Sequence, residues 1–340
     1  ICQRQDHTYY NGHLWENEDR VALSNKIVSP DTTLPKTADL LDLKTYAPFQ
    51  QKDYGPDFLV KAALNFIDKN KDKPFFLYYP TPLPHVSLQA PQRLVDYYHE
   101  KFGDEMPFRG GSYFPCRYPR ATYAAMITLL DEQVGQIVQQ LKKNGLYENT
   151  IIMFCSDNGP AFNAGVDPVF FNSAGPFKET YGWGKGFLRE GGIRMPFIVQ
   201  WPGKVKAGST SDHISATIDM MPTFCEMFNI KTPANVDGIS MLPEILGNTS
   251  TQKKHEYLYF EYPEYGGQQA VRVGNWKAIR MELMKGVIKT ELYDLSKDAA
   301  EENDVAAQNP DVVKKLEGIM KREHQTPEVE RFTIPVLEEM

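Results

Sequence analysis

Cysteine is scarce in this chain, which has four among 340 residues: Cys2, Cys116, Cys155 and Cys225. No two of them form the C-x-x-C pair of structural zinc sites, so the sequence gives no sign of such a site. Cys155 ends an apolar run and Cys225 lies in an apolar helical pattern, so we expect both to be packed free thiols. A pairing of Cys2 with Cys116 stays open, because nothing in the sequence argues for it.

Long apolar runs and an excess of positive charge are also missing. No run approaches the roughly 20 apolar residues of a membrane-spanning helix. The chain has 37 Lys and Arg against 44 Asp and Glu, a net charge of −7 at pH 7. Without a basic stripe, nucleic acid is not expected as the main partner. A small anionic substrate is still possible, since it needs only a local cluster of cations.

Helical and strand patterns alternate along the first two thirds of the chain. The helical patterns cover 54–69, 119–144 and 219–228, and the apolar strand patterns cover 74–79, 150–155 and 196–201. Each helical pattern carries apolar residues on one face, whereas each strand pattern is a short apolar run bounded by turn residues. This alternation predicts an α/β domain with a mostly parallel sheet flanked by helices.

The pattern changes near residue 252, where short strand patterns follow one another. They cover 256–262, 269–274, 276–281 and 291–295, and a helical pattern covers 310–322. Tight turns such as Gly274-Asn275 join them, which favours antiparallel pairing. We therefore predict two domains, an α/β domain over 1–251 and a small antiparallel α+β subdomain over 252–340.

The motif Ser156-Asp157-Asn158-Gly159 directly follows the apolar run 150–155. Open α/β sheets carry their ligand sites at the carboxyl ends of strands. A carboxylate beside a carboxamide suits a hard divalent cation such as Ca²⁺ or Mg²⁺. The alternative is an Asx-turn without a ligand, which Asp-Asn-Gly forms readily.

Three further motifs accompany this one in a fixed order. Pro84-His85 lies upstream, and Gly182-Trp183-Gly184-Lys185-Gly186 and Glu190-Gly191-Gly192-Ile193-Arg194-Met195-Pro196 lie downstream. In this order the four motifs resemble the arylsulfatase family of the alkaline-phosphatase superfamily, and the resemblance covers nearly all of the chain. It implies an alkaline-phosphatase-like α/β fold and a sulfuric ester hydrolase acting on a sulfated sugar or glycan. It also implies a periplasmic or secreted location.

The resemblance assigns roles to four residues. Asp157 and Asn158 match the family's metal ligands, with Ca²⁺ as the expected ion and Mg²⁺ as the alternative. Lys185 matches the lysine that contacts the sulfate, where a fixed cation stabilises charge on the sulfuryl oxygens. His85 matches the histidine that binds sulfate or protonates the leaving alcohol. The alternatives are an exposed loop lysine and a loop histidine held by backbone groups.

Further residues covered by the resemblance have other expected roles. His7 and Arg272 are candidates for a sugar pocket, although a structural role explains each of them as well. The paired glycines Gly191 and Gly192 suit a tight turn. We expect Arg194 to hold that turn through an ion pair with Glu190.

The family's nucleophile is not found in this sequence. It is a formylglycine made from Cys or Ser within C/S-x-P-x-R, and no Cys or Ser here has Pro at +2 and Arg at +4. The adjacent Asp-Asp pair that the family uses for the same metal is absent too, and the chain begins at Ile1 without a methionine. We therefore expect the C-terminal part of a sulfatase, inactive alone, whose N-terminal segment supplies the formylglycine.

Two other functions stay open. The first is hydrolysis of phosphate or phosphonate esters by another member of the superfamily, although Asn158, where those enzymes tend to have His, favours a sulfatase. The second is a non-catalytic protein that binds a glycan or an ion.

Overall fold

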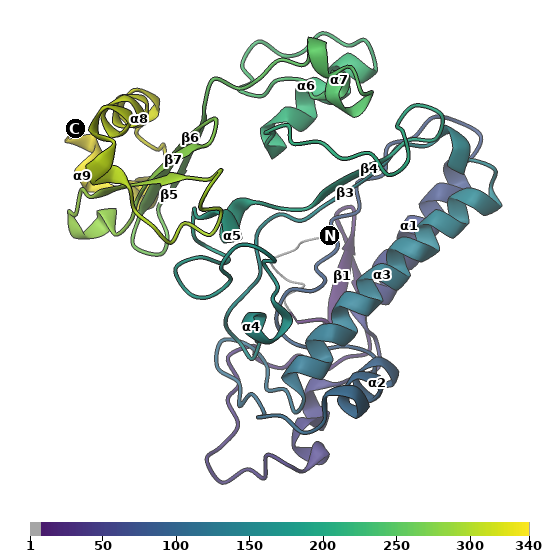
Figure 1. The fold of residues 1–340 in the computed structure, drawn as a ribbon. Coiled ribbons are helices and arrows are strands. Elements are labelled where there is room, and N and C mark those ends of the chain that lie inside the picture. The colour runs from purple at the N-terminus through teal and green to yellow at the C-terminus, as the bar shows by residue number, and fades with distance from the viewer. Residues whose placement is uncertain (1–7, 340) are drawn as a thin grey trace. The chain divides into compact units, whose positions relative to one another are not determined.

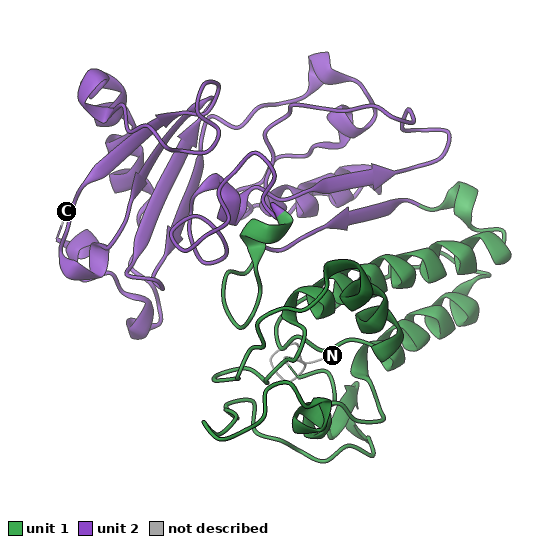
Figure 2. Cartoon of the chain, turned by 60° about the horizontal axis from the view of Figure 1, so that its bottom comes forward, with its two compact units in different colours: residues 1–150, 161–171 green, residues 151–160, 172–340 purple. Residues whose placement is uncertain are grey.

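A computed structural model describes residues 8–339 and carries them in two compact units (Figure 2). Unit 1 comprises residues up to 150 together with 161–171, and unit 2 comprises 151–160 and 172–340. The domain boundary expected near residue 252 falls inside unit 2 and stays a prediction. His7 lies outside the described residues.

Unit 1 is built around three helices. Its elements are β1 (His13–Glu16), β2 (Asp19–Ala22), α1 (Gly55–Asn70), α2 (Gln92–Phe102), α3 (Pro119–Lys143) and α4 (Pro168–Phe171) (Figure 1). The long α3 packs against both α1 and α2, and its buried residues Ala121, Ala125 and Met126 join the core of the unit. A proline in the first turn of α1 and of α3 suits a position that needs no N–H donor. Both long helices expected from the sequence are confirmed.

The predicted strand over 74–79 is wrong. Residues 74–80 are not assigned to any strand, and the side chains of Phe76 and Tyr78 are 66% and 76% exposed. An apolar run forms a strand only when a neighbouring strand takes its backbone hydrogen bonds. Residues 8–339 provide no such neighbour for this segment.

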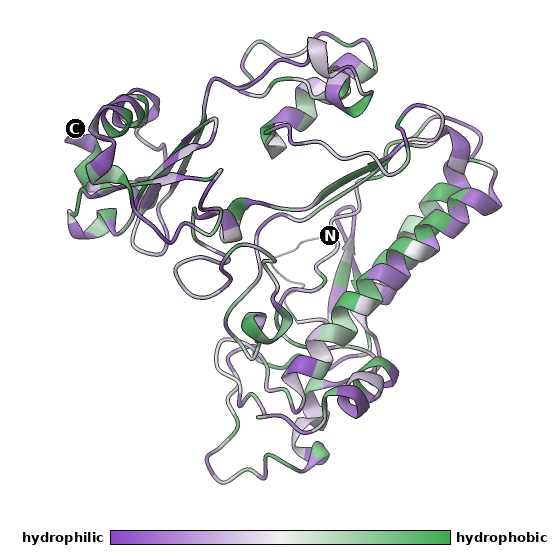
Figure 3. Ribbon diagram, viewed as in Figure 1, coloured by the Kyte–Doolittle hydropathy of each residue, from purple (hydrophilic) through white to green (hydrophobic). Residues whose placement is uncertain are grey.

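Unit 2 begins with an antiparallel pair, β3 (Ile152–Cys155) and β4 (Phe197–Gln200). Both strands match the sequence prediction, and Figure 3 shows them as largely apolar. They are only partly buried, and Ile198 is 59% exposed. Three short helices, α5 (Glu190–Ile193), α6 (Met220–Met227) and α7 (Leu242–Ile245), complete this part of the unit.

The C-terminal part of unit 2 is an antiparallel sheet in the order β5-β6-β7-β8. Its elements are β5 (Leu258–Tyr262), β6 (Gln268–Val273), β7 (Trp276–Arg280), β8 (Thr290–Asp294), α8 (Pro310–Glu323) and α9 (Pro335–Glu338). The apolar face of α8 packs on the sheet, where Leu316 and Met320 meet Val271 and Leu292. The predicted antiparallel subdomain and its helix are confirmed.

All strand pairs within residues 8–339 are antiparallel. The parallel pairing expected for the α/β sheet is therefore not formed by the described part of this chain alone. No helix of that part is both long enough and apolar enough to cross a membrane.

The cysteines differ from expectation at one position. Cys225 is buried and free, as predicted, and Cys116 is also a buried free thiol. Cys155 was expected to be packed, but it is exposed. It is the last residue of β3, on a strand that is buried only in part.

Candidate active site

The loop after β3 forms a compact turn that leaves Asp157 at the surface. The Asn158 backbone N–H donates to Asp157 Oδ1 over 2.9 Å, and the Asn158 amide Nδ2 donates to the Gly159 carbonyl over 2.9 Å. The Ser156 hydroxyl donates to the Asn158 carbonyl over 3.0 Å. The Asx-turn expected as the alternative to a metal loop would need the Gly159 N–H to donate to Asp157, but that N–H donates to the Gly192 carbonyl over 2.9 Å. The loop is compatible with a metal site, because Asp157 is exposed and the side chain of Asn158 keeps its amide oxygen as an acceptor.

Gly159 crosses α5 at very short range. Its N–H donates to the Gly192 carbonyl over 2.9 Å, and a Cβ placed on Gly159 would lie 1.9 Å from the Gly191 carbonyl oxygen. A Cβ on Gly191 would in turn lie 1.8 Å from the Lys178 carbonyl oxygen. Close backbone approach, which glycine alone permits, is therefore the reason for these glycines.

Lys185 is held against the same loop. Its backbone N–H donates to the Pro160 carbonyl over 3.0 Å, and a Cβ on Gly184 would lie 2.8 Å from that oxygen. The Lys185 side chain is half-buried. Burial lowers the pKa of its ammonium, while the Asp157 carboxylate acts in the opposite direction. The structure thus brings Lys185 and Asp157 into one neighbourhood of unit 2.

A buried ion cluster surrounds Glu190, the first residue of α5. The Lys277 Nζ atom, on β7, is 3.0 Å from Glu190 Oε1 and 3.0 Å from Glu301 Oε1. Glu190 Oε2 is 3.3 Å from Arg272 Nη1 and 3.6 Å from Arg194 Nη1, so the expected Glu190–Arg194 pair is confirmed. The three cations outweigh burial and keep the pKa of Glu190 low, whereas burial raises the pKa of Glu301.

This cluster bears on Arg272 and shows what sequence reasoning missed. The Arg272 guanidinium is committed to Glu190 and to the Gly274 carbonyl, so its contacts are structural, and its role in a sugar pocket stays a prediction. Lys277 and Glu301 were not identified from the sequence. No local motif marks them, since Lys277 is 87 residues from Glu190, one of the two carboxylates that it contacts.

His85 belongs to unit 1. Its backbone N–H donates to the Pro82 carbonyl over 2.8 Å, and its carbonyl accepts from the Tyr9 hydroxyl over 2.6 Å. The ring Nδ1 hydrogen-bonds to the carbonyl of the next residue, Val86. Because His85 lies in one unit while Asp157, Asn158 and Lys185 lie in the other, its convergence with them stays a prediction.

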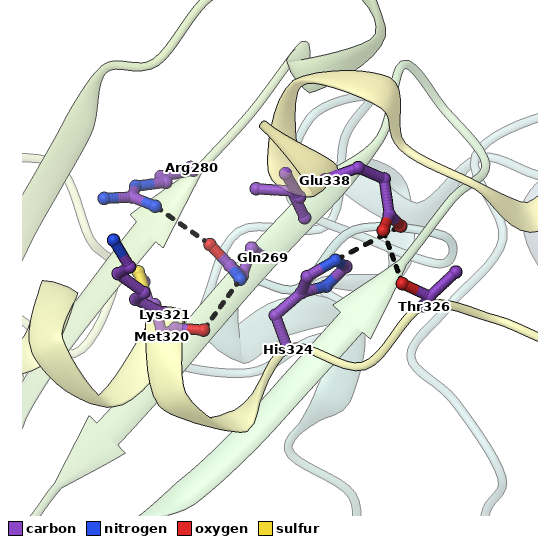
Figure 4. A pocket seen from close by; sticks show the side chains of 8 residues that line it. Gln269, Arg280, Met320, Lys321, His324, Thr326 and Glu338 are labelled. Carbon is purple, nitrogen blue, oxygen red and sulfur yellow. Dashed lines mark hydrogen bonds and ion pairs between the residues drawn. The ribbon is translucent and has the colours of Figure 1, made fainter. Parts of the chain in front are cut away.

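A pocket of about 260 Å³ in the C-terminal part of unit 2 is lined by none of the predicted site residues (Figure 4). Several of its polar groups contact one another: the His324 ring is 3.3 Å from Glu338, and Arg280 donates to Gln269 over 3.1 Å.

The donor atoms after β3 fit part of a metal shell. Asp157 and Asn158 offer hard oxygen ligands, of which Ca²⁺ takes six to eight. Across residues 8–339, no three His, Cys, Asp or Glu side chains gather to hold a metal ion. The described residues thus fit a divalent cation only as contributors to a shell that other groups would have to complete.

The family follows from comparison with known proteins. The sulfatase family model matches residues 5–230, and a model of the C-terminal region of N-sulphoglucosamine sulphohydrolase matches residues 179–326. This chain belongs to the sulfatase family. The resemblance carried by its four motifs is thereby confirmed.

Individual relatives agree with this assignment. N-acetylgalactosamine-6-O-sulfatase of Bacteroides thetaiotaomicron is 30% identical over 282 residues, which are 78% of this chain and 50% of the relative. The crystal structure of Ps i-CgsB in complex with k-i-k-neocarrahexaose is 28% identical with a TM-score of 0.62, and it covers 80% of this chain and 55% of its own. The chain thus spans about half the length of these relatives.

The fold is shared more widely than the sulfatases. Phosphonate monoester hydrolase of Agrobacterium radiobacter, at 19% identity, has a TM-score of 0.58 and covers 78% of this chain and 59% of its own. The predicted alkaline-phosphatase-like α/β fold with a C-terminal antiparallel sheet is confirmed by these neighbours.

The crossing of Gly159 over α5 gives a first prediction. Gly159→Ala is expected to lower the free energy of unfolding by about 1–3 kcal/mol, because the added methyl group collides with backbone rather than with a movable side chain. Chemical denaturation measures the change. Gly135→Ala is the control: that glycine is inside α3 with open space around it, so alanine should raise stability by about 0.5–1 kcal/mol. Equal, small effects of both substitutions would contradict the crossing.

Proposed function

We propose that this chain is the C-terminal part of a sulfatase that hydrolyses a sulfate ester on a sugar. The observation that carries the proposal is the contact between two loops of unit 2. The Lys185 N–H donates to the Pro160 carbonyl, so a cation and the Asp157-Asn158 oxygen donors are held within one neighbourhood. Family membership, the motif order and the N-acetylgalactosamine-6-O-sulfatase relative support this reading.

Four observations support the view that an N-terminal portion completes the fold and the site. Residues 74–80 lack a strand partner within the described chain, and β3 and β4 are only half-covered. The chain spans about half the length of its relatives, and it contains no C/S-x-P-x-R motif. Added strands would pair with the open segment and cover the exposed Phe76, Tyr78 and Ile198.

In this proposal each residue has a separate task. Lys185 places a positive charge against the sulfate oxygens, where negative charge builds up in the transition state. His85 delivers a proton to the leaving alcohol oxygen. Asp157 and Asn158 would hold Ca²⁺, with Mg²⁺ as the alternative. The bound cation would offset the negative charge of the sulfate group and of the nucleophile that attacks it. The formylglycine nucleophile would come from the N-terminal portion, and His7 and Arg272 would contact the sugar.

The test compares the 340-residue chain with a longer protein that includes the upstream coding region. The chain alone is expected to release no sulfate from an aryl sulfate, because a binding site without a nucleophile does not turn over. The longer protein, if the upstream region carries C/S-x-P-x-R, is expected to release sulfate from an aryl sulfate and from sulfated sugars. Sulfate release by the chain alone, in proportion to its concentration, would refute the fragment reading.

The same assay decides between the remaining alternatives. A phosphate or phosphonate ester hydrolase would turn over aryl phosphate faster than aryl sulfate. The likeness to phosphonate monoester hydrolase shows the fold alone, so it does not favour this alternative over a sulfatase. A non-catalytic binding protein would turn over neither substrate.

Calcium binding gives a further prediction. The isolated chain is expected to bind Ca²⁺ weakly or not at all, because Asp157 and Asn158 supply too few of the six or more oxygens that the ion takes. Isothermal titration calorimetry measures this directly, with Asp157→Ala as the matched variant. Tight binding that Asp157→Ala abolishes would mean that a complete shell exists within these 340 residues.

A further inference from the structure

We propose that Gln268 is the positioning residue for Lys185. Gln268 begins β6 and its side chain is completely buried. The inference rests on the proposed function, because it concerns the lysine that the proposal places against the sulfate. Gln268 lies outside the four motifs that carry Asp157, His85 and Lys185, although the family resemblance covers the stretch that contains it.

The Gln268 amide holds the backbone directly after Lys185. Its Nε2 donates to the Gly186 carbonyl over 2.7 Å, and its Oε1 accepts from the Leu188 N–H over 3.0 Å. One amide thus satisfies an acceptor and a donor of the same loop, in the way a neighbouring strand would. These bonds connect residues 80 or more positions apart in sequence, so they anchor the loop to the C-terminal sheet.

Lys185 therefore lies between two anchors. On its N-terminal side, its own N–H donates to the Pro160 carbonyl of the Asp157 loop. On its C-terminal side, the Gly186 carbonyl is held by Gln268. Gly186 has a φ of +87°, and a Cβ there would lie 2.5 Å from the Tyr265 ring, so the loop has little room to relax in that direction. Loss of the Gln268 anchor is expected to let the Lys185 ammonium move relative to Asp157.

The neighbouring Gln269 is a closely matched control. It is the same residue type on the same strand, and it is only 1% exposed. Its Nε2 donates to the Tyr259 hydroxyl over 2.9 Å and to the Met320 carbonyl of α8 over 3.3 Å, and its Oε1 accepts from Arg280 (Figure 4). Gln269 thus makes three side-chain hydrogen bonds, as Gln268 does when its 3.5 Å contact with the Glu264 carbonyl is included, but none of those of Gln269 reaches the Lys185 loop.

The experiment compares Gln268→Met with Gln269→Met, since methionine nearly matches glutamine in volume and removes both hydrogen-bonding groups. Amide hydrogen exchange of the 340-residue chain reads the loop without any need for activity. In Gln268→Met, exchange at residues 184–188 is expected to rise at least tenfold, whereas in Gln269→Met it should rise at α8 and stay unchanged at 184–188. Gln268→Glu, which keeps the acceptor for Leu188 but loses the amide donor to Gly186, is the second variant and should also loosen residues 184–188.

Activity of the longer protein supplies the second readout. Gln268→Met is expected to lower kcat by roughly 10- to 100-fold on a sulfated sugar with a smaller change in KM, as displacement of a charge by about 1 Å does. Gln269→Met, at matched loss of thermal stability, should leave kcat within about twofold of the parent. Unchanged exchange at 184–188 in both Gln268 variants, or equal kcat losses in the two methionine variants, overturns the inference. If the parent protein releases no sulfate at all, the proposed function fails, and hydrogen exchange still decides whether Gln268 holds the loop.

Discussion

Replacing Lys277 by methionine is expected to lower the free energy of unfolding by about 3–5 kcal/mol. The Lys277 ammonium is 1% exposed and lies 3.0 Å from a carboxylate oxygen of both Glu190 and Glu301, which are equally buried. Its removal leaves two buried carboxylates with one fewer cation to neutralise them. An uncompensated buried charge destabilises a fold by more free energy than the intact ion pair contributes to it. Urea denaturation of the 340-residue chain measures the loss.

The pH dependence of this loss has a definite sign. Burial already raises the pKa of Glu301, and Lys277 lowers it, so the substitution raises the folded-state pKa further above the unfolded value. A carboxyl with a raised folded pKa destabilises the fold as pH rises through that pKa. The loss of unfolding free energy caused by Lys277→Met should therefore be largest near neutral pH and become smaller as the pH falls.

Lys289→Met is the matched control for this experiment. Lys289 is 66% exposed and lies 3.2 Å from Glu291 and 3.8 Å from Asp304, so it too touches two carboxylates. Exposed ion pairs contribute about 0–1 kcal/mol because water screens them. Similar losses for the two variants would mean that the buried cluster does not stabilise unit 2 in the way its geometry indicates.

Replacing Lys185 by alanine is expected to lower kcat by about 10²- to 10³-fold in the longer protein. The substitution should raise KM far less, because a fixed cation is most useful when negative charge has built up on the sulfuryl oxygens and the leaving oxygen. Steady-state kinetics on a sulfated sugar separates the two effects. The exposed Lys204, whose replacement by alanine changes the net charge equally, is the control and should leave both constants unchanged.

A different split between the constants would change the role of Lys185. A rise in KM at constant kcat would show that the lysine binds substrate and transition state equally well. If neither kcat nor KM changed, Lys185 would be a loop lysine without a role in catalysis, and the proposed contact with the sulfate would be wrong.

The sequence predicted elements whose information is local and missed those that depend on a partner. Helices α1 and α3 were found because an apolar face repeats along a helix whatever lies opposite it. The turn at Gly274-Asn275 and the two strands that it joins were also found, because turn residues between two strand patterns are a local signal too. Residues 74–79 were predicted as a strand because an apolar run looks the same with or without a neighbour to receive its hydrogen bonds.

The candidate site divides along the same line. Asp157, Lys185 and the Glu190–Arg194 pair belong to short motifs, so their proximity in unit 2 could be anticipated. The contacts of Lys277 and Gln268 could not be anticipated, because the bonds of Lys277 to Glu190 and of Gln268 to the Lys185 loop span 80 or more residues and nothing nearby in the sequence marks these partners. Burial of a lysine and a glutamine on strands runs against their usual exposure, and only the fold reveals it.

Two backbones that approach closely enough to exclude a methyl group, as Gly159 and α5 do, cannot shift independently of each other. A ligand arriving at Asp157 therefore meets a surface whose conformational entropy was already lost when the chain folded. A ligand that binds there pays little additional conformational entropy for ordering the loop. For the same reason the loop cannot easily change shape to accept a different ligand. Under the proposed function, discrimination among sugars is therefore expected to come from side chains outside this crossing, and variation between relatives should concentrate there rather than in the Asp-Asn-Gly loop.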